Sequence, residues 1–474
     1  MGSGLVKSVS IPEAPSGFPY FCLFFESPDK VYILHGSPEV RETIRAAFEM
    51  HWKGEITSNF SNATEVLQLS DCYAFVVLAR QQNTLVRKIL CHAFTDLYAM
   101  GWKIIAASDI SRSKVISGIF FQKIKGLDSS QFACLNLDRE DRLQFINFPE
   151  NTWKIAEKCI DDGYQPGLSK KNKAHSEISY KLNEEPWNKS GSSLIPSYRL
   201  LLECLKSLDH QGYQLEASIN LKPRGCLFND RNPREADCLF FTSSKQVLDK
   251  SSGKFALLVM PNSAQACQII LLGGQKDMRQ SIEKSVRKIK SAFKVRGTET
   301  SYTVELQRSE DDGFDPTKLL INLFESFNDL GWEFYATVDV SRSMENTSCF
   351  VLRKDAKTEA QRYFALDLKW EDTIRIQGGS DDLKEEIVKV IEDHWPPNIA
   401  RQEPLEGGVW EIQLCGNPWG NETGDAMMAR NLICYLLERL SKMRWRLKAC
   451  ADLSTEINRG YTKQHVDTWF FAKS

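Results

Sequence analysis

LINLFESFNDLGWEFYATVDVS, residues 320–341, is the most informative segment of the sequence. Its apolar residues recur every three or four positions up to Leu330, which predicts a helix with one buried face. Gly331 can adopt the left-handed backbone conformation that ends a helix, and the apolar run that begins at Trp332 has the composition of a strand. The segment therefore predicts a helix, a tight turn and a strand.

The same pattern occurs three more times, in residues 89–111, 201–222 and 432–454. Each copy has an aromatic residue after the turn, taken here as position zero: Trp102, Tyr213, Trp332 and Trp445. Position four is alanine in every copy, and position seven is Asp109, Asn220, Asp339 or Asp452. The four segments align from position zero to position seven without a gap, which predicts four tandem copies of one unit of about 110–120 residues.

The upstream halves of the four copies also correspond. Each begins with two apolar strands and a helix, and a third strand follows at 73–79, 178–187, 302–307 or 409–419. The unit is predicted as β-β-α-β-α-β-β, a two-layer α+β unit with an antiparallel sheet. The predicted division is a flexible leader at 1–17 and repeat units at 18–126, 127–246, 252–356 and 360–474.

Glycine stands at the end of the second helix in three units, as Gly101, Gly212 and Gly331. Glycine accepts the left-handed conformation at about 1 kcal/mol less strain than other residues. Arg444 occupies this place in the fourth unit, so we expect a less favourable helix end there.

Composition limits the classes of protein that this chain can belong to. The 474 residues are 42% hydrophobic and 26% charged, with a formal net charge of −2, which excludes general disorder and gives no basic surplus for nucleic acid. No run of about 18 uncharged apolar residues predicts a transmembrane helix. The 13 cysteines form no C-x-x-C pair, which indicates a reducing, cytoplasmic compartment.

The recurrent acidic position is the best candidate for a site. Asp109, Asp339 and Asp452 are each followed two residues later by serine, a pair that closes a turn through local backbone hydrogen bonds. No histidine or second carboxylate recurs in step with them, so the sequence favours a structural turn and predicts no catalytic residue. The alternative is a ligand site in which these carboxylates meet polar groups of a neighbouring unit.

Other conspicuous residues have ordinary structural explanations. The tryptophans Trp102, Trp332 and Trp445 are expected to anchor the core, with an aromatic ligand cage as the alternative. His51 and His394 occupy matching places at helix ends, where the helix dipole favours them, and no further ligand predicts a metal site. The lysine-rich run 170–173 is expected to be a solvated loop. Phosphate-loop and dinucleotide motifs are absent, so no cofactor is predicted.

The leader MGSGLVK places Gly2 after the initiator methionine, as N-myristoylation requires, although Val6 breaks the usual preference for Ser or Thr at position six. A single myristoyl chain binds membranes with a constant of only about 10⁴ M⁻¹, so stable attachment needs a second element. The alternative is an unmodified leader.

The leader resembles the MGxGLxK leader of the raftlin family. Residues 201–221 and 320–340 are also similar to raftlin segments in their leucine-rich helix, glycine-aromatic turn and apolar strand. The resemblance implies an acylated, raft-associated membrane protein. Raftlins carry cysteine where this chain has Ser3, so their dual acylation is not carried over.

The sequence leaves three hypotheses for function. The first is a non-enzymatic, membrane-peripheral adaptor or scaffold, acylated at Gly2 and located in the cytoplasm at the inner face of the plasma membrane. It would bind protein partners through its units and the membrane surface through its N-terminus. The second is a soluble interaction protein without a lipid anchor. The third is a ligand-binding or enzymatic protein that uses clefts between the units.

Overall fold

The structure is a computed structural model that describes residues 11–70, 80–110, 117–127, 130–174, 176–189, 191–221, 236–243, 253–262, 266–289, 293–298, 301–307, 315–340, 346–354, 360–420, 423–453 and 466–473. Gly2 and the serines at 111, 341 and 454 lie outside these residues.

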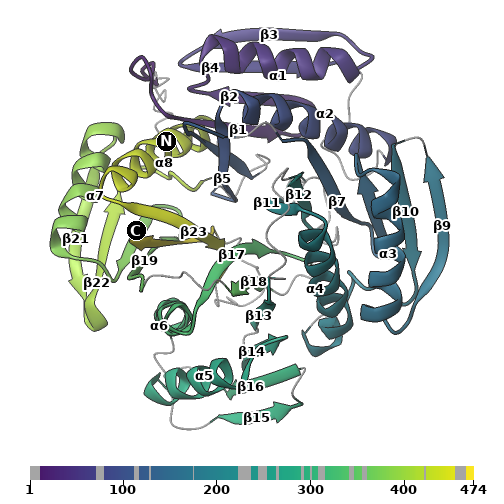
Figure 1. Cartoon of the computed structure of the whole chain (residues 1–474). Coiled ribbons are helices and arrows are strands. Elements are labelled where there is room, and N and C mark those ends of the chain that lie inside the picture. The colour runs from purple at the N-terminus through teal and green to yellow at the C-terminus, as the bar shows by residue number, and fades with distance from the viewer. Residues whose placement is uncertain are drawn as a thin grey trace, which may run out of the picture.

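Four units follow one another along the chain (Figure 1). Unit 1 contains β1 (Tyr20–Glu26), β2 (Lys30–Leu34), α1 (Pro38–His51), β3 (Ile56–Ser61), β4 (Thr64–Leu69), α2 (Arg80–Ala99), β5 (Trp102–Ser108) and β6 (Gly118–Lys123). Unit 2 contains β7 (Phe132–Asp138), β8 (Arg142–Ile146), α3 (Glu150–Gly163), β9 (Leu168–Ala174), β10 (Glu177–Leu182), α4 (Ile195–His210), β11 (Tyr213–Ile219) and β12 (Cys238–Ser243).

Units 3 and 4 repeat this order. Unit 3 contains β13 (Phe255–Asn262), β14 (Ala266–Leu272), α5 (Lys276–Ile289), β15 (Lys294–Gly297), β16 (Ser301–Gln307), α6 (Pro316–Asp329), β17 (Trp332–Val338) and β18 (Asn346–Lys354). Unit 4 contains β19 (Tyr363–Lys369), β20 (Thr373–Gln377), α7 (Asp381–His394), β21 (Ile399–Leu405), β22 (Val409–Leu414), α8 (Thr423–Lys442), β23 (Trp445–Ala451) and β24 (Thr468–Lys473).

Each unit forms a six-stranded antiparallel sheet with two helices. The strand order in unit 1 is β3-β4-β2-β1-β6-β5, and the other three sheets have the corresponding order. The predicted α+β class and the four tandem units are confirmed. Each unit has one strand more than predicted, the edge strand β3, β9, β15 or β21. Unit 1 places β4 where residues 73–79 were expected, and those residues lie outside the described part of the chain.

The edge strands escaped prediction because they are polar and exposed. Every residue of β9 is exposed, and this strand contains the lysine-rich run 170–173. The expectation of a loop there is wrong, because the run pairs with β10 through partners such as Lys171 and Tyr180. Lysines on an edge strand discourage pairing with the edge of another sheet.

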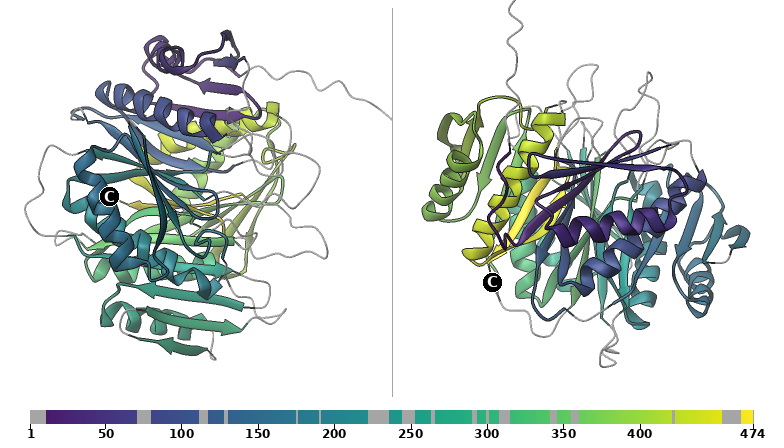
Figure 2. Two further views of the ribbon diagram at one scale, coloured as in Figure 1. Left: turned by 90° about the vertical axis from the view of Figure 1, so that its right-hand side faces the viewer. Right: turned by 90° about the horizontal axis from the view of Figure 1, so that it is seen from above.

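The four units form a closed ring (Figures 1 and 2). The second helix of each unit packs on its own sheet and on the first strand of the next unit: α2 on β7, α4 on β13, α6 on β19 and α8 on β1. The first strand of each sheet is therefore covered on both faces, whereas the edge strand stays exposed. This explains why the first strands are continuous apolar runs, such as β1, in which Tyr20–Phe25 are all buried.

The helix ends agree with the expected backbone conformations. Gly101, Gly212 and Gly331 have φ of 84°, 82° and 78°, and Arg444 adopts the same left-handed region at 66°. None of the helices in the described part of the chain combines the length and the apolarity that crossing a membrane requires.

Candidate functional site

The strands β5, β11, β17 and β23, one from each unit, meet around the centre of the ring. The recurrent alanines of position four line a central cavity of about 90 Å³: Ala106, Ala217, Ala336 and Ala449. A larger side chain there would meet the neighbouring strands, which explains the alanine. Each strand also has a β-bulge one residue earlier, which contributes Ile105, Glu216, Tyr335 or Lys448 to the same cavity.

The bulge residues give the central cavity polar contacts between units. The Tyr335 hydroxyl accepts a hydrogen bond from the Leu215 backbone N–H at 2.8 Å. Glu216 lies 3.6 Å from the ammonium of Lys103. Burial lowers the pKa of Lys448, although Glu333 opposes the shift. The four side chains differ in chemistry, so these contacts distinguish the units from one another.

The recurrent acidic residues Asp109, Asp339 and Asp452 lie along one further cavity of about 90 Å³, which Asp237 and Asp467 also line. At the interface of units 4 and 1, the Asp109 N–H donates to Asp467 Oδ2 at 2.8 Å, and the Asp467 N–H donates to the Asp109 carbonyl at 3.1 Å.

The interface of units 2 and 3 repeats this pair of hydrogen bonds. The Asp339 N–H donates to Asp237 Oδ2 at 3.0 Å, and the Asp237 N–H donates to the Asp339 carbonyl at 2.8 Å. Between units 3 and 4, Ser348 Oγ donates to the Asp452 carbonyl at 2.9 Å. The acidic positions thus join neighbouring units, a contact that the expected local turn does not include. Among the described residues, no group of three or more His, Cys, Asp or Glu side chains is arranged to hold a metal ion.

Two buried arginines occupy equivalent positions in α2 and α8 and face the next unit. Arg87 Nε lies 3.0 Å from the sulfur of Cys238. Burial opposes ionisation of that thiol, but Cys134 and the charge of Arg87 together lower the pKa of Cys238 to about 7. Arg430 faces unit 1, where a Cβ on Gly118 would lie 3.3 Å from its Nε. Gly118 begins the last strand of its unit, as Cys238 does, and its missing side chain gives this arginine room.

The histidines singled out from the sequence have partners that the sequence did not indicate. His51 Nε2 lies 3.0 Å from His92 Nδ1 on α2. The ring of His394 stacks on Tyr435 with centroids 3.5 Å apart. His35, at the end of β2, hydrogen-bonds through Nε2 to Asn431 Oδ1 at 2.7 Å. His35 and His394 therefore both pack against α8, at the seam where unit 4 closes onto unit 1.

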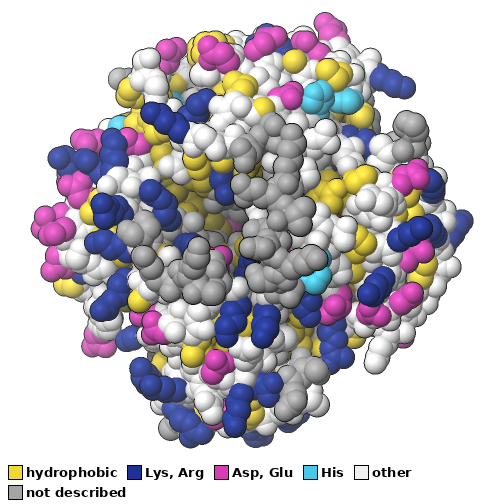
Figure 3. All heavy atoms as spheres, in the orientation of Figure 1, with side chains coloured by type: hydrophobic (Ala, Val, Ile, Leu, Met, Phe, Trp, Pro, Cys, Tyr) yellow, Lys and Arg dark blue, Asp and Glu magenta, His cyan; other side chains and the backbone are white. Residues whose placement is uncertain are grey.

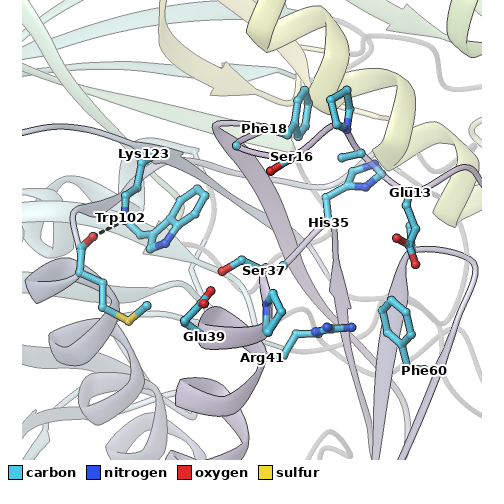
Figure 4. Close-up of a pocket in the computed structure, with 17 residues that line it drawn as sticks. Glu13, Ser16, Phe18, His35, Ser37, Glu39, Arg41, Phe60, Trp102 and Lys123 are labelled. Carbon is cyan, nitrogen blue, oxygen red and sulfur yellow. Dashed lines mark hydrogen bonds between the residues drawn. The ribbon is translucent and has the colours of Figure 1, made fainter.

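A cavity of about 540 Å³ adjoins this seam (Figure 4). Its walls are the N-terminal segment 13–18, the turn between β2 and α1, and side chains from β3, β5 and β6. We call it the seam pocket. Ile11, just before it, is buried in the core shared by units 1 and 4, which fixes the N-terminal segment to the ring.

The recurrent tryptophans are buried, as expected of core anchors. Trp102, Trp332 and Trp445 are 6%, 1% and 4% exposed. A lysine at the end of the last strand lies over each ring: Lys123, Lys354 and Lys473, at 5.2, 5.7 and 5.4 Å from the centroid. Tyr213 occupies the place in unit 2, opposite Ser243 on β12. Trp102 also lines the seam pocket.

One protein-family model for a repeated domain matches the chain four times, over residues 19–122, 131–242, 254–353 and 362–472. These matches cover most of the chain, which therefore belongs to the family that this domain defines. They do not identify that family as raftlin, so the raftlin resemblance stays a prediction. No curated protein and no solved structure matches the chain.

Proposed function

We propose that this four-unit protein is a non-enzymatic, membrane-peripheral adaptor that combines an acyl chain on Gly2 with a basic surface on unit 3. The observation that carries the proposal is that basic surface. Exposed cations follow α5 and the neighbouring edge strand β15: Lys276, Lys284, Arg287, Lys288, Lys294 and Arg296. Figure 3 shows Lys and Arg gathered over this part of the ring.

The basic surface supplies the second element that a single acyl chain needs. Each lysine or arginine near an anionic leaflet contributes about 1 kcal/mol to binding. Glu283 and Glu305 pair with Arg287 and Arg296 and reduce the total, at 3.6 and 3.5 Å. Val295, which is 45% exposed between Lys294 and Arg296, adds apolar surface to the patch.

The attachment point of the leader limits where an acyl chain can reach. Gly2 lies nine positions before the buried Ile11, and an extended chain spans at most about 3.3–3.6 Å per residue. An acyl group on Gly2 therefore lies within about 30 Å of the seam. The remaining surface of the ring would stay free for protein partners.

Two measurements test the two elements separately. Myristoylation adds about 210 Da to the chain that lacks Met1, which intact-mass measurement detects. Gly2→Ala should move the protein from the membrane to the soluble fraction. An unmodified mass, with unchanged membrane recovery of Gly2→Ala, would leave a soluble interaction protein as the better description.

The basic surface is tested with phosphatidylserine vesicles and the Gly2→Ala chain, so that acylation plays no part. The double variant Lys284→Glu with Lys288→Glu should reduce co-sedimentation with these vesicles, and more strongly at low salt. The matched control is Lys384→Glu with Lys389→Glu on α7, the equivalent helix of unit 4. Equal loss in both double variants would argue against a specific basic surface.

A further inference from the structure

The seam pocket is an unassigned cavity with both signs of charge on its walls. We propose that it binds a small zwitterion, a molecule that carries an acidic group and an ammonium group a few bonds apart. The inference does not rest on acylation of Gly2 or on the basic surface of unit 3. Its volume of about 540 Å³ lies within the usual range for small-molecule pockets.

The charges that line the pocket balance. Lys123 and Glu39 lie on one side in Figure 4, together with Trp102, and Arg41 and Glu13 lie on the other. A purely anionic ligand would meet both carboxylates, and a purely cationic ligand would meet both cations. A zwitterion offers each charged side chain of the pocket a group of the opposite sign.

Arg41 is the residue best placed to hold the acidic group. Its side chain is only 19% exposed, and its nearest carboxylate oxygen, on Glu65, lies 3.8 Å from Nε, beyond hydrogen-bond distance. The other oxygen of Glu65, Oε1, accepts hydrogen bonds from Arg45 at 2.7 and 3.2 Å, and Oε2, the oxygen that faces Arg41, has no hydrogen-bond partner. The guanidinium lies 4.0 Å over the ring of Phe60, which holds it against the wall of the pocket. A guanidinium presents a planar pair of donors that matches a carboxylate or a phosphate.

His35 provides an acceptor on the same pocket. It is 8% exposed, and its Nδ1 has no hydrogen-bond partner. Because Nε2 is engaged with the oxygen of Asn431, the neutral ring keeps a lone pair on Nδ1. An ammonium group donates three hydrogen bonds, and Nδ1 of His35 and the carboxylates of Glu13 and Glu39 are the acceptors that the residues of this pocket offer it.

The backbone at His35 supports a role in binding. Its φ is 60°, a left-handed conformation that is strained for a residue with a Cβ. The other units have residues that tolerate this conformation at the same place, Asn147, Gly273 and Gly378. Unit 1 therefore keeps a histidine where asparagine or glycine would fit more easily, and it does so at the pocket.

The pocket also offers aromatic surface beside the charges. Phe60, on β3, is 45% exposed, and Phe18, at the end of the N-terminal segment, is partly buried. Such faces bind an apolar substituent or an alkylated ammonium. The same chemistry occurs in a free amino acid with an apolar side chain and in the headgroup of a zwitterionic phospholipid.

The test measures binding to the full-length Gly2→Ala chain by calorimetry. The probes are O-phosphoethanolamine and L-phenylalanine, with inorganic phosphate and ethanolamine as the corresponding single charges. We expect binding of at least one zwitterion, at least tenfold tighter than either single charge. If phosphatidylethanolamine vesicles compete with the probe, the natural ligand is a lipid headgroup. If they do not compete, the natural ligand is a soluble molecule.

Variants place that binding in the seam pocket. Arg41→Met should weaken zwitterion binding about tenfold or more, since a charge-assisted hydrogen bond contributes about 1.5–3 kcal/mol. Lys384→Met changes the equivalent position of α7 and should leave affinity unchanged. His35→Asn, which keeps a residue suited to the backbone, should also weaken binding. Two results would overturn the proposal. One is that no zwitterion binds at a probe concentration of about 10 mM, which is on the order of the dissociation constants of the weakest small-molecule sites. The other is that inorganic phosphate alone binds as tightly as the zwitterions.

Discussion

Asp467→Ala is the substitution that most directly tests how the ring is closed. Oδ2 of Asp467 accepts hydrogen bonds from Ser108 Oγ and from the Asp109 N–H, each at 2.8 Å, across the interface of units 4 and 1. Ser108 is 1% exposed and Asp109 is 8% exposed, so water cannot easily replace the lost acceptor.

The expected loss follows from these two donors. A buried donor left without an acceptor costs about 1–3 kcal/mol, so the variant should lose about 2–6 kcal/mol of unfolding free energy. Ser108 Oγ also accepts a hydrogen bond from Trp469 Nε1 at 2.9 Å, which keeps the serine in place and limits relaxation. Asp467→Asn retains an acceptor oxygen and should cost less.

Asp237→Ala is the matched comparison at the interface of units 2 and 3. The Asp339 N–H donates to its Oδ2 across this interface at 3.0 Å, and Ser218 Oγ, from the same unit as Asp237, donates at 2.6 Å. Only one of the two hydrogen bonds therefore crosses the interface, whereas both do at Asp467. Units 2 and 3 are consecutive in the chain, whereas units 4 and 1 are joined only by contacts. We therefore expect Asp467→Ala, and not Asp237→Ala, to increase hydrogen exchange in both β5 and β24.

Urea unfolding followed by circular dichroism gives the change in free energy, and hydrogen exchange locates it. Exchange is needed because a chain of four units can unfold in more than one step. Unchanged or increased stability of Asp467→Ala would refute the reasoning. Repulsion among the carboxylates of the cavity would then outweigh the hydrogen bonds that we assign to Asp467.

Three further predictions concern single features of the ring. Arg444→Gly should raise the unfolding free energy by about 1 kcal/mol in urea titrations, because glycine relieves the left-handed strain at φ 66°. Gly118→Ala should lower it by about 1–3 kcal/mol, because the added Cβ would lie 3.2 Å from the sulfur of Cys22. Burial lowers the pKa of both His35 and His394, so the unfolded chain binds protons more readily, and thermal stability should fall as pH drops below about 6.5. His394→Gln should reduce that dependence.

The repeated unit could be predicted from the sequence because its signature is short and gap-free. The helix end, the turn residue and the aromatic residue are neighbours in the chain, so the spacing between them is the same in every copy. The edge strand could not be predicted in the same way, because its exposed face places no constraint on composition. β9 reads as a solvated lysine run, and only its pairing with β10 makes it a strand.

Closure of the ring is reflected in the sequence of the first strands. A sheet with one solvated face alternates apolar and polar residues, but β1 is buried at six successive positions. Such a run requires a second covering layer, which is α8 from the far end of the chain. The contacts of Asp109 could not be predicted, because Asp467 follows a segment whose spacing differs between units.

The seam is the place where the ring departs most from fourfold repetition. Three interfaces join units that are consecutive in the chain, whereas the fourth joins α8 to β1, and Ile11 is buried in the core that units 4 and 1 share. Segment 13–18 precedes the first strand of unit 1 and forms one wall of the seam pocket. His35 likewise replaces the asparagine or glycine of the other units. The pocket is lined by the N-terminal segment and unit 1, and two of its residues, Phe18 and His35, contact Tyr435 and Asn431 of α8. A ligand that holds these two side chains in place would favour the closed ring, since a ligand stabilises the state to which it binds. Occupancy of the seam pocket should therefore offset part of the stability lost in Asp467→Ala, and failure of a bound zwitterion to do so would separate the pocket from ring closure.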